Sequence, residues 1–156
     1  MTEKKGKEDL RTWTVSTATV STAVEGLKRV ARMLEDGELS DDYQRDARKF
    51  RLCQMECKLA YNEFRWIAVE GNLFTILVSS VQAYQLLVVA ESMCDRMARE
   101  YAPTKSGIDI GLRGYVEEMI RVTKLLVSHA LEEGERARGM WSRKKSAEAT
   151  EEEHDG

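Results

Sequence analysis

Apolar residues recur at three- and four-residue steps along four long stretches of the chain, a spacing that predicts helices with one buried face. The stretch over residues 71–90 differs from the others because it contains no charged residue and is apolar on every side. A helix of that kind must be buried on most sides, either in a protein core or in lipid. Serines and glutamines lie near its midpoint, where lipid would leave their polar groups without partners. We therefore expect the central helix of a soluble bundle and not a membrane span.

The first predicted helix covers residues 8–35 and is expected to end at Gly37, since glycine suits the left-handed conformation that terminates helices. Its expected buried positions are Trp13, Val20, Val24, Leu27, Ala31 and Leu34. The tandem pentapeptides at residues 14–18 and 19–23 are rich in threonine and valine, which also suit a short strand. Helix is favoured because the apolar steps continue unbroken to the end of the segment.

The second predicted helix begins at Ser40, the expected N-cap, which is followed by two aspartates in the first turn. Its expected buried positions are spaced as in a coiled-coil seam and are Phe50, Cys53, Cys57, Ala60, Phe64 and Ile67. Gly71 and Asn72 then offer a break between two helices. One continuous helix over residues 40–102 is the alternative, and it would require an extended coiled-coil dimer. The break is favoured because glycine suits the end of one helix and asparagine the start of the next.

The third predicted helix covers residues 73–101, and the fourth begins at a Ser-x-x-Asp capping box over residues 106–109. The expected buried positions of the fourth helix are Leu112, Tyr115, Met119, Val122, Leu126 and Ala130. Gly134 and Gly139 are expected to weaken this helix, so that order fades over residues 133–141.

Four long helices joined by short loops predict an all-α, antiparallel, up-down-up-down four-helix bundle. We expect it to form a single domain over residues 1–141. Residues 142–156 are first basic and then acidic, and they contain too little apolar surface to offset the entropy of ordering. They are predicted to form a disordered acidic C-terminal tail.

The composition agrees with a globular, helix-rich protein, since 42% of the residues are hydrophobic and 33% are charged. A net charge of −3 gives no general attraction to nucleic acid or anionic lipid. The N-terminal residues lack an apolar signal segment, and the cysteines are odd in number. We therefore expect a cytoplasmic protein.

The residues that could ligate a soft metal are Cys53, Cys57, Cys94 and His129. A zinc site would need them at one height of the bundle, but tight loops would place Cys94 opposite Val116, far from His129. A di-iron site needs a glutamate three residues before a histidine, and only Glu151 and His154 in the predicted tail have that spacing. We expect buried structural cysteines, no metal or other cofactor, and no enzymatic activity.

A basic run with an aromatic residue inside it lies where the fourth helix meets the tail. Its candidate contacts to phosphate or to a membrane surface are Arg136, Arg138, Trp141, Arg143, Lys144 and Lys145. Cations beside an aromatic ring suit nucleic acid or anionic lipid. They also suit the solvated C-terminal end of a helix, whose dipole favours positive charge.

Uncharged stretches over residues 12–24, 71–90 and 125–131 give a more informative pattern. If every loop is tight, Ala18 lies level with Lys58, Lys58 with Gln85, and Gln85 with Leu125, so that three uncharged stretches meet at one height. Serine and threonine could make this surface polar enough for solvent, but an uncharged surface of this extent favours an interface. Its predicted contact residues are Val15, Thr19, Thr22 and Ser128.

These patterns favour a non-enzymatic helical-bundle interaction protein, either a self-assembling subunit or an adaptor. The expected partner is a second copy in a homo-oligomer or a helix of another protein. Peripheral binding of nucleic acid or of an anionic membrane through residues 136–145 is the alternative.

Overall fold

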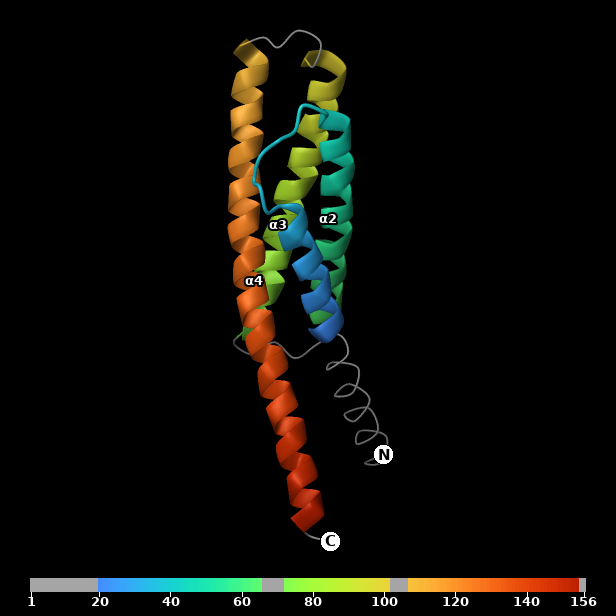
Figure 1. Ribbon diagram of the computed structural model, residues 1–156, viewed down its shortest axis with the longest axis vertical. Coiled ribbons are helices and arrows are strands. Elements are labelled where there is room, and N and C mark those ends of the chain that lie inside the picture. Colours follow the sequence, from blue (N-terminus) through green and yellow to red (C-terminus); the bar gives the residue numbers. More distant parts are fainter. Residues whose placement is uncertain (1–19, 66–71, 102–106, 155–156) are drawn as a thin grey trace.

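The structure is a computed structural model of the chain, and it describes residues 20–65, 72–101 and 107–154. Residues 20–33 are helical, followed by α2 (Tyr43–Phe64), α3 (Asn72–Arg96) with the π-helical turn η1 (Met97–Tyr101), and α4 (Gly107–His154). Successive helices run in opposite directions and pack side by side (Figure 1). The predicted all-α, up-down-up-down bundle is confirmed. The separation of α2 from α3 excludes the continuous helix, although α2 ends before the predicted break and Ile67 lies outside the described residues.

The described part of the N-terminal helix, residues 20–33, lies beside only part of the bundle (Figure 1). It ends in a turn at Gly37, which has a φ of 64° and whose N–H donates to the Leu34 carbonyl at 3.1 Å. This confirms Gly37 as the helix terminator. Residues 34–42, which we call the strap, then climb to the start of α2 between α2 and α4 (Figure 1). The strap takes the place of a fourth helix in that half of the bundle, and its apolar anchor is Leu39, which is 4% exposed.

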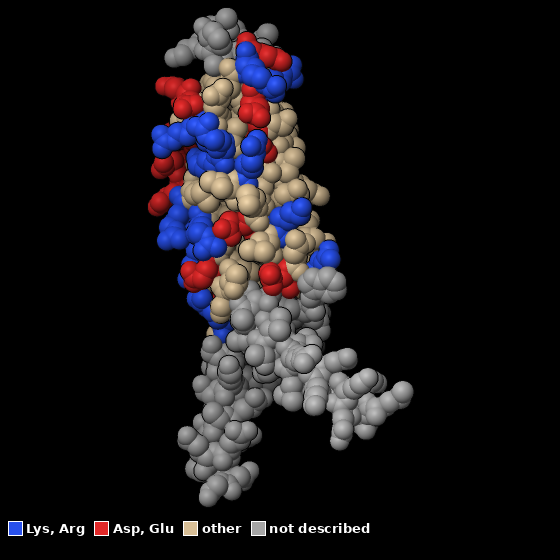
Figure 2. Space-filling model, turned by 90° about the vertical axis from the view of Figure 1, so that its right-hand side faces the viewer, with Lys and Arg blue, Asp and Glu red and all other residues tan. Residues whose placement is uncertain are grey.

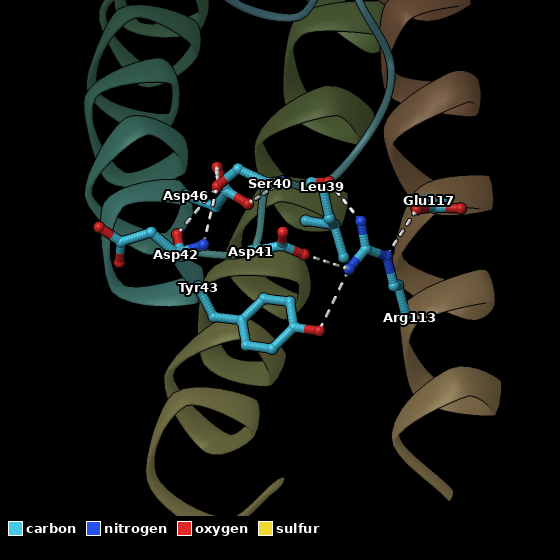
Figure 3. A network of polar contacts seen from close by, with 8 residues as sticks. All are labelled: Leu39, Ser40, Asp41, Asp42, Tyr43, Asp46, Arg113 and Glu117. Atoms are coloured by element: carbon cyan, nitrogen blue, oxygen red, sulfur yellow. Dashed lines mark hydrogen bonds and ion pairs between the residues drawn. The ribbon is translucent and has the colours of Figure 1, made fainter. Parts of the chain in front are cut away.

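The start of α2 lies two residues beyond the predicted position (Figure 3). Asp42 is the N-cap, and its carboxylate accepts a hydrogen bond from the Arg45 N–H at 3.1 Å. Ser40 instead donates its N–H and its hydroxyl to the buried carboxylate of Asp46, at 2.7 and 3.0 Å. Serine and aspartate are both good N-caps. The contact with Asp46 holds Ser40 outside the helix, so Asp42 is left to cap it.

The core stripe predicted for α2 is buried as far as Phe64. The stripe predicted for α4 is buried at Met119 and Ala130 but is shifted by one residue at two other positions. Tyr115 and Val122 are 54% and 39% exposed, and their chain neighbours Val116 and Thr123 are buried instead. The sequence allows both phases because apolar residues occur at adjacent positions. Thr123 can be buried because its hydroxyl donates to the Met119 carbonyl at 2.8 Å, which satisfies the polar group within the helix.

α4 continues unbroken through Gly134 and Gly139, where the sequence predicts that order fades. Gly134 is buried, and a Cβ atom there would lie 2.8 Å from Cγ2 of Val24, so the glycine allows close approach of the N-terminal helix. Where the sequence predicts a disordered tail, the backbone continues as helix to His154 and projects beyond α2 and α3 (Figure 1). Alanine, lysine and glutamate in this segment are strong helix formers.

Replacing Gly134 by alanine should lower the free energy of unfolding by about 1 kcal/mol. Valine has one strongly preferred rotamer in a helix, so Val24 cannot move away, and overpacking of about 1–3 kcal/mol exceeds the gain in helix propensity. Gly114→Ala is the matched control, because nothing lies within 4 Å of a Cβ atom there and the variant should be stabilised. Urea unfolding measures both. Equal stabilisation of the two variants would contradict the close packing at Gly134.

Candidate interaction surface

Two contacts set the heights of α2, α3 and α4 relative to one another. The side-chain amide of Gln54 donates to the Leu87 carbonyl at 3.0 Å, which puts residue 54 level with residue 87. A Cβ atom on Gly134 would lie 3.9 Å from Cδ1 of Ile76, which puts residue 134 level with residue 76. Counting along antiparallel helices from these contacts, Val88 lies level with Val122 on α4 and close to the level of Met55 on α2.

Exposed apolar side chains of all three helices gather at that height. The group, called here the apolar belt, comprises Leu52, Met55, Val88, Val89, Val122 and Leu125. Their exposed fractions range from 38% at Val88 to 71% at Leu125. Each helix therefore turns apolar atoms toward solvent at the same level, and none of these side chains can titrate.

α3 extends this surface along the bundle. Phe74 is 57% exposed, Gln82 and Gln85 are also exposed, and no charge occurs over residues 72–90. Figure 2 shows the result, since the edge of the molecule formed by α3 is largely tan while charged side chains gather over α2 and the strap. The helix Phe74–Glu100 is long and apolar enough to span a membrane, and 33% of its most apolar window is buried. The exposed residues of α3 over 74–91 are Phe74, Gln82, Gln85, Val88 and Val89, and the others are half-buried or buried.

The part of this surface that α2 contributes is not among the uncharged stretches that the sequence predicts to form an interface. Leu52, Met55 and Leu59 are 55%, 63% and 41% exposed, and their spacing of three and four residues puts them on one face, opposite the core stripe. This second apolar row is visible in the sequence. A search for missing charge passes over it, because Glu56 and Lys58 lie between its members.

The N-terminal helix lies beside a different part of α2 from the part that a tight loop predicts. The Arg29 guanidinium pairs with the Glu56 carboxylate at 2.9 and 3.1 Å, whereas a tight loop would put residue 29 beside Ala47. The strap causes this shift of roughly two and a half turns. The predicted meeting of three uncharged stretches therefore holds for α3 and α4 but not for the N-terminal helix.

The two predicted interface residues that the structure describes, Thr22 and Ser128, are not brought together. Val15 and Thr19 lie outside the described residues, while Thr22 and Ser128 are exposed. Glu25 contacts Arg138 at 3.3 Å, so Thr22 lies level with a part of α4 beyond residue 138 and about three turns from Ser128.

The basic run is partly neutralised within the chain. Arg136 pairs with Glu132 and Glu133, and Arg138 pairs with Glu135 and Glu25, at distances of 2.6 to 3.3 Å. The side chains of Trp141, Arg143, Lys144 and Lys145 lie outside the described part of the structure. Two of the cations predicted to contact phosphate are thus already engaged with carboxylates.

A surface groove of about 780 Å³ lies between the strap and the first turns of α2. Arg45, Arg48 and Lys49 line it on α2, while Asp36 and Glu38 line it on the strap. These charged groups are exposed or half-buried, and the buried Asp46 already accepts both hydrogen bonds from Ser40. The groove therefore lacks the convergent buried polar groups that characterise a small-molecule site.

The cysteines of α2 and α3 are packed in the core. Cys53, Cys57 and Cys94 are free and fully buried, and burial raises the pKa of each thiol to about 12. His129 is exposed on α4. Within the described ranges, no group of three or more His, Cys, Asp or Glu side chains could hold a metal ion.

Comparison with protein-family models, with curated proteins and with solved structures finds no match for this chain. The functional argument therefore rests on the geometry of the described surface.

Proposed function

We propose that this chain is a non-enzymatic interaction protein that docks another protein on the apolar belt. The observation that carries the proposal is the coincidence of exposed apolar side chains on three neighbouring helices at one height. Exposed apolar side chains that gather on helices packed against a common neighbour, as α2 and α4 pack against α3, favour a binding surface. The belt supplies contact area and no reacting group.

The energetics of burial support this use. Covering a leucine side chain completely contributes about 1.5–3 kcal/mol, and Leu125 and Met55 keep most of their surface in water at 71% and 63% exposure. A few such residues at the centre of a contact carry most of the energy in protein interfaces. We place the protein in a reducing compartment such as the cytoplasm, because its buried cysteines are unpaired.

The test is the size of the native protein in an extract of the cells that produce it. The wild-type chain should elute in a complex larger than its 17.8 kDa monomer, and the double variant Met55→Glu with Leu125→Glu should elute as the monomer. Gln44→Glu is the control, because this exposed residue near the start of α2 lies away from the belt and gains the same charge. A complex that survives the double substitution, or a monomeric wild type, would refute the belt as a docking surface.

A further inference from the structure

We infer that the partner on the apolar belt is a second copy of this chain, docked face to face with α3 at the centre of a two-fold contact. The inference rests on the proposed function and names its partner. It is carried by the charge pattern around α3, by the hydrogen-bonding groups on that face, and by its size.

A two-fold contact lays one surface against itself, so a charge close to the axis meets the same charge from the other copy. α3 has no charge over residues 72–90, so this cost does not arise along that part of the helix. The exposed polar groups Gln82 and Gln85 carry amides, which both donate and accept hydrogen bonds, so each can pair with the same residue of a second copy. A strongly acidic or basic partner would find nothing on this face to pair with.

Two cations at the margins of the belt are neutralised within their own chain. Arg51 pairs with Glu91 at 2.6 Å on the α2 side, and Arg121 pairs with Glu118 at 2.6 Å on the α4 side. Counting from the Gln54 and Gly134 contacts, Arg51 and Arg121 both lie near the height of Val89. At these two positions a second copy therefore meets an ion pair and not a lone cation.

The size of the face also suits a stable dimer. From Phe74 to Val89 α3 is about 24 Å long, at a rise of about 1.5 Å per residue. Two interhelical spacings of roughly 8–10 Å carry the surface across to α2 and α4. The footprint is on the order of 500 Å² in projection. Protruding side chains add accessible area to this projection, and a standard interface buries ~800 Å² per partner.

Sedimentation equilibrium of the purified full-length chain tests the inference. The wild type should show twice the 17.8 kDa chain mass at micromolar concentration. Val88→Arg and Gln85→Lys should each weaken the dimer roughly 100-fold or more, because each puts a strongly hydrated charge into the contact. Gln85 is exposed, so its substitution leaves the fold intact, as unchanged helical circular dichroism should confirm.

Charge complementation then identifies the partner as this chain itself. Gln85→Lys and Gln85→Glu should each be monomeric alone, and an equimolar mixture should regain the dimer mass. A dimer that neither Val88→Arg nor Gln85→Lys weakens, or a mixture that stays monomeric, would overturn the inference. A monomeric wild type would also overturn it; if the complex in the extract still depended on the belt, the proposed function would stand with a different protein partner.

Discussion

The free energy of unfolding should fall steeply above pH 9, because Cys53, Cys57 and Cys94 remain protonated in the folded state but ionise in the unfolded chain. Burial raises the pKa of each folded thiol from its ordinary value of 9.0 to about 12. Between these values the unfolded state binds fewer protons than the folded state, so rising pH favours unfolding. The stabilisation by neutral thiols is complete below pH 9 and is lost progressively as the pH approaches 12. Each thiol contributes up to about 1.4 kcal/mol per pH unit to this loss, so the three together contribute up to about 4 kcal/mol per pH unit.

Urea unfolding at several pH values between 7 and 10.5, under reducing conditions, measures this effect. The control is the triple variant with alanine at all three positions, which should lose about 1 kcal/mol or more per site at pH 7 but should show a shallower fall above pH 9. Lysine and tyrosine ionisation affects both proteins alike. If the two pH slopes coincide, the buried thiols do not account for the alkaline sensitivity. Cys57→Ala alone should remove about a third of the extra slope, which keeps the test available if the triple variant folds poorly.

The bundle could be predicted because helical periodicity is local and strong. The core stripe of α2 follows directly from the spacing of its apolar residues, and Gly37 ends the first helix for a backbone reason that the sequence displays. The strap shows no such signal. A nine-residue connection can be a tight loop or an extended segment, and the choice depends on whether Leu39 finds a place in the core.

That choice determines the relative heights of the helices, and with them the predicted interface. The assumption of tight loops predicts the relative heights of α2, α3 and α4 nearly correctly, because the connections between these helices are short. The N-terminal helix departs from the height that a tight loop predicts, because the strap adds length along the bundle axis, as the pairing of Arg29 with Glu56 shows. The prediction that Thr22 and Ser128 share one interface depends on a tight loop after the first helix, and not on the chemistry of the two residues.

The sequence predicts only part of the apolar belt, for a related reason. The lack of charge along α3 is a property of the sequence, and it indicates this face correctly. The contribution of α4 depends on which of two neighbouring phases is buried. If the buried face of α4 is predicted one residue out of phase, Val122 is assigned to the core. In the structure Val122 is 39% exposed and belongs to the belt. Adjacent apolar residues leave that decision to tertiary packing, and the burial of Thr123 settles it.

Replacing Arg113 by alanine should lower the free energy of unfolding by about 2–3 kcal/mol, because this residue of α4 holds the strap in place (Figure 3). Its guanidinium donates to the Leu39 carbonyl at 2.7 Å, to the Tyr43 hydroxyl at 3.4 Å and to the Asp41 carboxylate at 3.3 Å. It also pairs with Glu117 at 3.2 Å on its own helix. The half-buried bond from a charged donor to the Leu39 carbonyl is worth the most, about 1.5–3 kcal/mol, whereas the pair with exposed Asp41 adds little.

The fork of the guanidinium makes Arg113 difficult to replace. Lysine keeps the charge but cannot reach the strap and Glu117 from one rigid plane, so Arg113→Lys should recover only a small part of the loss. Arg121→Ala is the matched control on the same helix, since its pair with Glu118 is exposed on both sides and should be worth less than about 0.5 kcal/mol. Hydrogen exchange supplies a local readout. The Ser40 N–H, which donates to Asp46, should exchange faster in Arg113→Ala and stay unchanged in Arg121→Ala. Equal stability losses in the two variants, with Ser40 still protected, would mean that Leu39 packing alone secures the strap and that the Arg113 contacts are incidental.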